Sequence, residues 1–264
     1  MSDLEIPMSK LKKLVRRAPL LRDLNLILHR GNTFVCPICD YRAKDLFAIG
    51  GDSAVLKQHA IVGGGRRYAG CYRCDSDDRE RLVYVYLREK LCLFCREKDL
   101  KILHIAPEEN LVTKFLEYGF REYICGDLLA PGYKYRAPIR NMDVMSIPFV
   151  DNYFDLIICN HVFEHIPDDK RAMTEVRRVL KEGGKAILQV PISKNAHATV
   201  EDASIIAPKE RERVFGQRDH VRIYGQDYVD RLTNAGFTVN RLNISREFPE
   251  FGLNTDEDLF VATK

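Results

Sequence analysis

Residues 154–190 read FDLIICNHVFEHIPDDKRAMTEVRRVLKEGGKAILQV, and this stretch decides the fold. Its first six residues, 154–159, form a strongly apolar segment that is typical of a buried strand. An amphipathic helix is expected over 168–180, with Gly183-Gly184 as its C-terminal cap. A second apolar strand is expected over 185–190. This strand–helix–strand order predicts a βαβ unit with parallel strands.

The same alternation continues on both sides of this unit. The pattern predicts further strands at 101–105, 122–125, 139–144, 237–242 and 259–263, and helices at 108–118 and 226–235. Strands alternating with helices predict an α/β fold, with a Rossmann-like sheet that carries helices on both faces. Ligands of such sheets bind at the carboxyl ends of the strands.

The N-terminal third has a different character. A rough apolar stripe predicts a helix over 4–30, stopped by Gly31-Asn32, and a second helix is expected over 77–90. Between them, 33–80 is rich in loops and could bury little core alone. We therefore expect two domains: 1–97, an N-terminal helix with a small metal-binding module, and 98–264, the α/β domain.

Two C-x-x-C motifs, Cys36-Pro-Ile-Cys39 and Cys71-Tyr-Arg-Cys74, lie 31 residues apart. Each motif can turn two thiolates toward one ion, and four sulfurs complete the tetrahedral shell of structural zinc. The alternatives are a redox pair or unpaired buried thiols. A third pair, Cys92 and Cys95, is expected to act as small hydrophobes at a helix end.

The composition excludes some classes of protein. The chain has 264 residues, of which 45% are hydrophobic, so it can bury one large α/β core with a small appendage. A formal net charge of +3 gives no strong indication of nucleic-acid binding. No apolar run approaches the roughly 20 residues of a membrane helix, and residues 1–13 lack a signal core, so a cytoplasmic protein is expected.

Acidic residues follow two of the predicted strands. Asp127 comes after the second strand, where such folds bind a ribose hydroxyl, and Asp143 follows the third strand. A carboxylate makes strong hydrogen bonds to ribose oxygens. Either acid alone could simply be a turn or cap residue. Together they favour a nucleoside-like cofactor.

Two stretches resemble a known family. DVMSIPFVDNYFDLIICNHVFEHIPDD (143–169) and RVLKEGGKAILQVP (178–191) are similar to class I S-adenosylmethionine-dependent methyltransferases of the methyltransferase-11 group. The resemblance covers roughly 100–264, and Glu182 replaces the proline of one family motif. It implies S-adenosylmethionine as cofactor and a seven-stranded sheet whose last strand is antiparallel.

The resemblance also implies a cofactor site. It places Asp127, with Leu128, at the ribose and Asp143, with Val144, at the adenine. Asn160 and His161 would line the methionine end, near the methyl group that is transferred.

The turn after the first strand departs from the family. Its usual glycines let the backbone approach the cofactor, whereas this chain reads HIAPEEN at 104–110. His104 stands where many members carry an acid, and Ala106 and Pro107 form the turn. Glu108 could bind the cofactor ammonium, or merely begin the helix, where an acid suits the dipole. The chain is similar to a zinc-containing subgroup with this turn.

The candidate catalytic residues are histidines, whose pKa values allow proton transfer near neutrality. His165 lies about one helical turn after His161, although it could instead be a core histidine. His220 belongs to the motif DHVRIYG (219–225), in the long connection 193–226, and Asp219 could orient it. Arg222 and Tyr224 of the same motif are expected to bind the substrate. Nearby arginines suggest an anionic acceptor, or simply a solvated loop: Arg211, Arg213 and Arg218.

Three functions remain in view. The leading hypothesis is O-methylation of a small molecule or saccharide, which would be the partner. The alternative is an RNA base methyltransferase that uses the zinc module, with its clustered arginines, to bind RNA. Against it, the N-P-P-Y-like turn of amino-methylating enzymes is replaced by Asn160-His161-Val162-Phe163. A second alternative is a non-catalytic zinc-stabilised scaffold, which only the missing glycines support.

Overall fold

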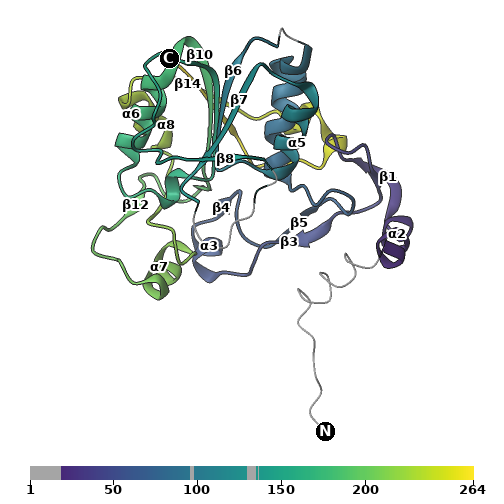
Figure 1. The fold of residues 1–264 in the computed structure, drawn as a ribbon. Coiled ribbons are helices and arrows are strands. Elements are labelled where there is room, and N and C mark those ends of the chain that lie inside the picture. Colours follow the sequence, from purple (N-terminus) through teal and green to yellow (C-terminus); the bar gives the residue numbers. More distant parts are fainter. Residues whose placement is uncertain (1–18, 96–97, 130–134, 136) are drawn as a thin grey trace.

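The computed structural model describes residues 19–95, 98–129, 135 and 137–264, and within them a seven-stranded sheet forms the centre of the molecule (Figure 1). The strands lie in the order β14-β15-β10-β9-β6-β7-β8. All neighbours from β10 to β8 are parallel, and β15 is antiparallel to both β10 and β14. This order confirms the Rossmann-like sheet and its antiparallel last strand. Their bounds are β6 (Lys101–Ile105), β7 (Glu122–Asp127), β8 (Ile139–Asn141), β9 (Phe154–Asn160), β10 (Leu180–Gln189), β14 (Thr238–Leu242) and β15 (Leu259–Thr263).

Helices cover both faces of the sheet. Ile102 of β6 and Ile158 of β9 share one core with α4 (Asp78–Val85), the π-helical turn Tyr86–Lys90 and α5 (Glu109–Tyr118). Leu103 and Ile157, one residue away in each strand, share the other core with α6 (Asp169–Val179) and α8 (Tyr228–Asn234). Figure 1 shows α5 on one side of the sheet and α6 and α8 on the other. Because successive strand residues point to opposite faces, burial of both faces explains the continuous apolar runs.

The N-terminal module, as we call residues 19–77, lies at the carboxyl end of the sheet (Figure 1). Its β4 pairs with β11 (Ile192–Ser193), which directly follows β10. Two other antiparallel pairs, β1–β2 and β3–β5, complete it. Its elements are α2 (Pro19–Leu28), β1 (Arg30–Val35), β2 (Arg42–Ala43), β3 (Phe47–Ile49), α3 (Ala54–Gln58), β4 (Ile61–Val62) and β5 (Arg67–Gly70).

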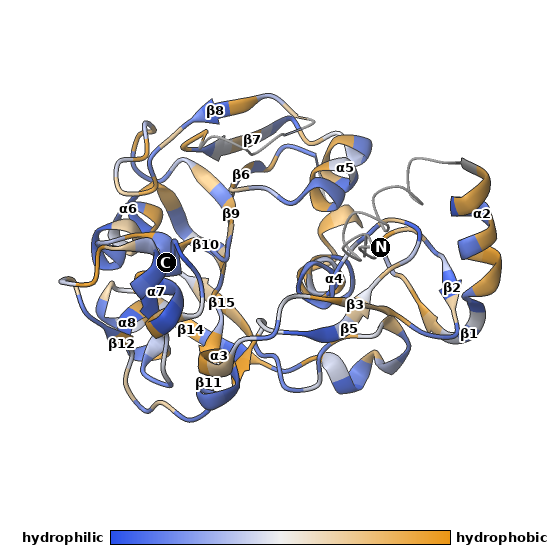
Figure 2. Ribbon diagram, turned by 90° about the horizontal axis from the view of Figure 1, so that it is seen from below, coloured by the Kyte–Doolittle hydropathy of each residue, from blue (hydrophilic) through white to orange (hydrophobic). Residues whose placement is uncertain are grey.

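The long connection after β10 lies beside this module. It contains β12 (Val200–Glu201), α7 (Pro208–Phe215) and β13 (Arg222–Ile223), and β12 pairs with β13. Helix α3 of the module contacts α7, and Figure 2 shows α3, β11 and α7 grouped together. The module and the connection therefore enclose the same edge of the sheet.

One predicted helix end and one predicted helix cap differ from the structure. Residues 4–18 of the helix expected over 4–30 lie outside the described residues, and the described helix ends at Leu28, with Gly31 inside β1. Helix α6 ends at Val179, close to the predicted end at residue 180, but the predicted cap Gly183-Gly184 lies within β10. Its last carbonyls, on Arg178 and Val179, accept hydrogen bonds from the backbone of residues 152 and 153, so no glycine cap is needed.

The boundary placed between 97 and 98 stays a prediction. Helix α4 precedes it, yet Leu82 and Val85 are buried in the same core as Phe115 of α5 and Ile158 of the sheet. Arg81, also on α4, donates to the carbonyls of Phe251 and Gly252, just before β15. The two parts therefore share a core.

The remaining cysteines differ in burial. Cys125 and Cys159 are buried in the core. Cys92 and Cys95 are exposed, so the prediction that they pack as small hydrophobes is wrong. Within the described ranges, no helix combines the length and the apolar character needed to cross a membrane.

Candidate active site

The predicted cofactor residues gather at the carboxyl end of three neighbouring strands. Ile105 of β6 is level with Gly126 of β7 and Cys159 of β9, so the residues that follow these positions lie at one edge of the sheet. Those residues are Ala106, Asp127 and Asn160. This edge is where open α/β sheets bind ligands.

The turn after β6 is held by side chains in place of glycines. Nε2 of His104 lies 2.7 Å from Glu108 Oε2, and its Nδ1 lies 2.8 Å from the Tyr123 hydroxyl. The other oxygen of Glu108 accepts a 3.0 Å hydrogen bond from Asn160 Nδ2. Glu108 makes no side-chain cap to α5. Glu108 therefore does more than begin α5, because its carboxylate connects His104 of β6 to Asn160 of β9.

Ala106 takes over the backbone role of a glycine. Its φ is 48°, in the left-handed region that side chains disfavour, and its N–H donates to the Gly126 carbonyl at 2.8 Å. Pro107, which follows, is buried. The backbone thus turns sharply at the strand end without glycine, at a cost in strain that is typical of functional sites.

The two acids after β7 and β8 differ in their surroundings. Asp127 is partly exposed and accepts a hydrogen bond from the Tyr135 hydroxyl, and Leu128 beside it is 54% exposed. Asp143 accepts a 2.8 Å hydrogen bond from the backbone of Met145, while Val144 is buried. Asp143 thus has a turn role in addition to any contact with a cofactor. Asp127 and Leu128 present the more accessible surface.

The four cysteines of the two C-x-x-C motifs lie together. Sγ of Cys36 is 3.6 Å from Sγ of Cys74, and Sγ of Cys39 is 3.7 Å from Sγ of Cys71. Four thiolates bound to one zinc at about 2.3 Å would be about 3.8 Å apart, so the spacing fits this metal. Hydrogen bonds from the three neighbouring thiols lower the pKa of Cys36.

The two cysteine motifs have the same local backbone. In each, the residue after the second cysteine has a positive φ, 59° at Asp40 and 64° at Asp75. Its N–H donates to the carbonyl of the first cysteine at 2.9 Å in both motifs. The Ser76 hydroxyl lies 3.4 Å from Sγ of Cys36 and 3.1 Å from Sγ of Cys74. Two matching turns therefore face one another across the cluster.

The segment after the second cysteine motif reaches the cofactor edge. The carboxylate of Glu80 accepts hydrogen bonds from the backbone N–H groups of Asn110 and Leu111, in the first turn of α5. It also accepts one from the Asn110 side chain. Burial raises the pKa of Glu80 to about 8. A residue from before the predicted domain boundary thus caps the helix that follows the Ala106 turn.

Buried polar atoms next to this edge have no partner among the described residues. They are Oδ1 of Asn160, both ring nitrogens of His161, Oε2 of Glu164 and both carboxylate oxygens of Glu257. Burial raises the pKa of both glutamates to about 8 and lowers that of His161 well below its usual value. Buried polar groups are nearly always satisfied. This cluster therefore points to a polar ligand.

Arg79 faces the same cluster from α4. It donates to the Gly63 carbonyl at 3.1 Å and pairs with Asp77 at 3.3 Å. Burial alone would lower its pKa, but the nearby carboxylates of Asp77 and Glu257 raise it. Its side chain is 33% exposed.

The predicted catalytic histidines lie together. The rings of His165 and His220 are 4.7 Å apart and nearly perpendicular. Asp219 contacts His165, at 3.3 Å from Nδ1, and so it is placed to orient this histidine rather than His220. Burial lowers the pKa of His220 to about 4 and also lowers that of His165. Both rings are therefore neutral near pH 7.

Arg222 and Tyr224 do not occupy the substrate side, which corrects that prediction. Arg222 is 3% exposed, and its guanidinium bonds to Glu201 and to three backbone carbonyls between 163 and 167. The hydroxyl of Tyr224, which is fully buried, donates to Asp169 at 2.8 Å. Because both side chains bond to groups inside the protein, they attach the connection after β10 to α6 and the turn before it.

Several other arginines are also paired, Arg67 and Arg81 inside the protein and Arg213 and Arg218 at its surface. Arg67 makes two hydrogen bonds to Asp78, and Arg81 is buried among backbone carbonyls. On and after α7, Arg213 pairs with Glu210 and Arg218 with Glu212. These contacts weaken the case for a basic surface that binds RNA or an anion.

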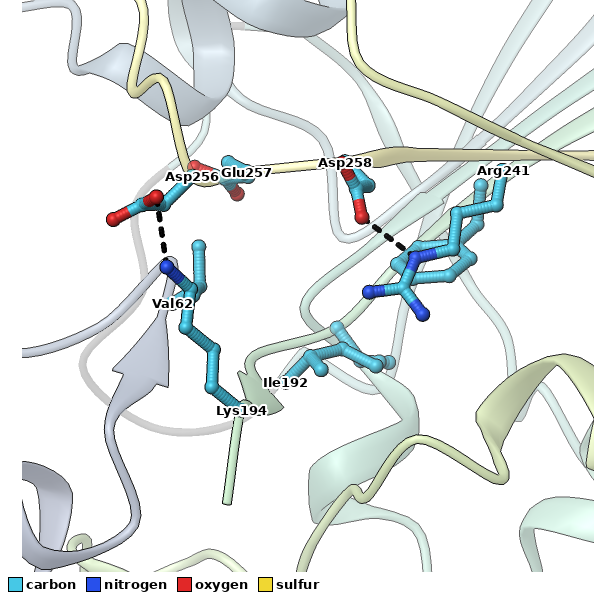
Figure 3. A pocket seen from close by; sticks show the side chains of 9 residues that line it. Val62, Ile192, Lys194, Arg241, Asp256, Glu257 and Asp258 are labelled. Carbon is cyan, nitrogen blue, oxygen red and sulfur yellow. Dashed lines mark hydrogen bonds and ion pairs between the residues drawn. The ribbon is translucent and has the colours of Figure 1, made fainter. Parts of the chain in front are cut away.

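A small cavity adjoins Glu257 (Figure 3). Its volume is about 120 Å³, which is below the size of a typical ligand pocket. Ion pairs between Lys194 and Asp256, at 2.7 Å, and between Arg241 and Asp258, at 2.6 Å, lie beside it. Val62 of β4 and Ile192 of β11 line it, so the module contributes to its wall.

Sequence reasoning missed three glutamates of this site. Glu80 follows the second cysteine motif, Glu164 lies inside the HVFEH motif, and Glu257 precedes β15. Only Glu164 could have been found from the sequence, because it lies within the HVFEH motif that contains two candidate histidines. The others reach the site through tertiary contacts of segments far apart in the chain.

Comparison with known proteins agrees with this geometry. Residues 110–188 match the family model of the methyltransferase domain named methyltransferase 11. The match spans α5 to β10, and over this part the chain is similar to that methyltransferase domain. It begins after the Ala106 turn and leaves out the cysteine cluster.

Individual relatives match over short stretches. A protein of Encephalitozoon cuniculi named as a methyltransferase is 49% identical over 51 residues, which are 18% of this chain and 24% of that protein. The demethylmenaquinone methyltransferase of Lactiplantibacillus plantarum is 38% identical over 52 residues, 20% of this chain and 22% of that protein. The chain thus spans less than a quarter of the length of these relatives.

One solved structure illustrates the fold comparison. An S-adenosylmethionine-dependent methyltransferase from Mesorhizobium loti aligns with 67% of this chain and 97% of its own, at 16% identity and a TM-score of 0.45. That level of likeness supports no statement about activity.

Proposed function

We propose that this chain is an S-adenosylmethionine-dependent methyltransferase that methylates an oxygen of a small, hydroxyl-rich molecule such as a saccharide. The observation that carries the proposal is the group of buried, unpartnered polar atoms on Asn160, His161, Glu164 and Glu257, beside the carboxyl end of a methyltransferase-type sheet. Several closely spaced donors and acceptors suit a ligand with several hydroxyl groups.

The residues at the strand ends fit the cofactor. The accessible carboxylate of Asp127 is suited to ribose hydroxyls, and exposed Leu128 offers an apolar surface for the base. Asn160 has one free buried oxygen at the expected methionine end. When bound, the cofactor would supply a methyl group on a positively charged sulfur. The chain would hold the acceptor in line with it.

His165 and His220 are the proposed catalytic residues on the acceptor side. Both are neutral near pH 7, so either can accept a proton or bind a positive centre. Support for an anionic acceptor now rests on Arg79, because Arg213 and Arg218 pair with Glu210 and Glu212. The four cysteines are proposed to hold structural zinc, since a closed shell leaves no open position.

The alternatives have less support. RNA binding by the module would need free basic side chains, whereas Arg67 of the module, and Arg79 and Arg81 just after it, bond inside the protein. The scaffold hypothesis rested on the missing glycines, but Ala106 adopts the backbone conformation that a glycine would take. RNA binding that weakens steeply with salt would restore the first alternative.

Calorimetric titration with S-adenosylhomocysteine tests the proposal. We expect binding by the zinc-replete wild type and at least a tenfold weaker affinity for Asp127→Ala, because the ribose loses its charged acceptor. Asp230→Ala, which changes an exposed acid on α8, is the control and should bind like the wild type. Absence of binding by the wild type would contradict the proposal and favour the scaffold.

A further inference from the structure

A second group of metal-ligand side chains, apart from the cysteines, lies on the acceptor side of the site. One ligand atom from each of Glu164, His165 and His220 lies within 4.8 Å of the other two. Glu164 and His165 belong to the 3-10 turn Phe163–His165 after β9, and His220 precedes β13. We propose that this Glu-His-His cluster binds one first-row divalent ion such as Zn²⁺.

His165 has one ring nitrogen next to a carboxylate that can orient it and the other facing Glu164. Asp219 lies 3.3 Å from Nδ1 of His165, and Nε2 of this ring faces Glu164 Oε1 at 4.0 Å. His220 makes its hydrogen bond to the backbone of Phe215. A carboxylate or carbonyl on the far nitrogen is the usual support of a metal-binding histidine, because it fixes the tautomer and the ring orientation.

Glu164 gives a second, independent indication. Glu164 is 2% exposed, and its Oε2 has no hydrogen-bond partner among the described residues. A buried carboxylate oxygen without a partner is costly unless a cation or donor satisfies it. Ligand atoms bound at about 2.0–2.2 Å to one ion are about 3–4 Å apart, so a closure of about 1 Å would complete the shell.

Three protein ligands leave a position open on the ion, as in catalytic rather than structural sites. If the proposed function holds, that position would take the acceptor oxygen and lower the pKa of its O–H group. The proton would pass to solvent, the oxygen would bond to the methyl carbon, and the carbon–sulfur bond would break. The two histidines would then bind the ion rather than accept the proton.

Metal content tests the site without any assay of activity. The full chain is dialysed against zinc, desalted and analysed by mass spectrometry of the metal. We expect two zinc ions per chain in the wild type and one in Glu164→Gln and in His220→Ala. His197→Ala removes an exposed histidine elsewhere and should keep two. A single zinc per wild-type chain would overturn the inference.

Because His220 is buried, its variant could fail to fold, so cobalt titration of the metal-free wild type gives a second test. Cobalt bound to the cysteines gives intense sulfur-to-metal charge-transfer absorption. A second equivalent should add only weak visible bands from nitrogen and oxygen ligands. Saturation at one equivalent would contradict the site. Calorimetry with S-adenosylhomocysteine separates the metal site from the proposed function. A protein that binds two metal ions but no S-adenosylhomocysteine would disprove the methyltransferase function and leave the metal site standing.

Discussion

Ala106 and Glu108 show how single residues replace a missing motif. Ala106 accepts a positive φ at the end of β6, and Glu108 connects His104 to Asn160 across the strand ends. The sequence predicted that these residues form the cofactor turn. It could not show that the glutamate bonds to a histidine four residues before it, because that contact depends on how α5 leaves the strand.

Replacing Glu108 should therefore damage cofactor binding. Glu108→Ala leaves Nε2 of buried His104 and the amide of Asn160 without their partner, and an unsatisfied buried group costs about 1–3 kcal/mol. We expect S-adenosylhomocysteine affinity to fall about tenfold or more in calorimetry. Glu109→Ala, an exposed neighbour on α5, should change little. Equal affinity in the two variants would exclude this role for Glu108.

Glu257 should make stability depend on pH. Burial raises its pKa from 4.5 to about 8 in the folded state. Between these values the unfolded chain has lost the proton that the folded chain keeps, so its contribution to the free energy of unfolding falls as pH rises from about 4.5 to 8. Glu257→Gln has no proton to lose.

The measurement is urea unfolding of both proteins at pH 5.5 and pH 8.5, with zinc present throughout. We expect the variant to gain stability relative to wild type on going to pH 8.5. A constant difference between the two proteins would show that Glu257 is not held protonated in the fold.

At the scale of elements, Glu80 on α4 links the cysteine cluster to α5. The segment that follows Cys74 continues directly into α4, and Glu80 caps the backbone at the start of α5. The positions of the strands and of most helices could be predicted from apolar periodicity, because both faces of the sheet are buried, whereas the seven-stranded sheet with an antiparallel last strand was implied by the family resemblance. The cap could not, because its donors lie about 30 residues further along the chain.

Loss of the Glu80 cap should weaken binding at the cofactor site. Glu80→Ala removes a buried acceptor from three donors on Asn110 and Leu111, and loss of a helix cap typically costs about 1 kcal/mol. We expect a lower Tm, together with weaker S-adenosylhomocysteine binding, because the turn before α5 is no longer fixed. Glu117→Ala, on the exposed part of α5, serves as the control. Unchanged binding in Glu80→Ala would show that the cap is only structural.

At the scale of the whole molecule, the N-terminal module and the α/β domain form one site. The pairing of β4 with β11 brings residue 63 next to Glu257, and Arg79 faces the same carboxylate. The two cysteine motifs could be recognised from the sequence because their spacing is a local pattern. The assignment of Arg222 and Tyr224 to the substrate failed for the opposite reason, since nothing local shows that a side chain will be buried against α6.

The contacts of Arg81 bear on how the chain folds during synthesis. Two of its four carbonyl partners, at 69 and 76, flank the second cysteine motif, but the other two, at 251 and 252, are synthesised about 170 residues later. The two cysteine motifs can therefore come together early, whereas this buried guanidinium gains all its partners only after residue 252 is made. Until then its unpaired charge opposes burial of α4, which delays closure of the site until the whole sheet exists.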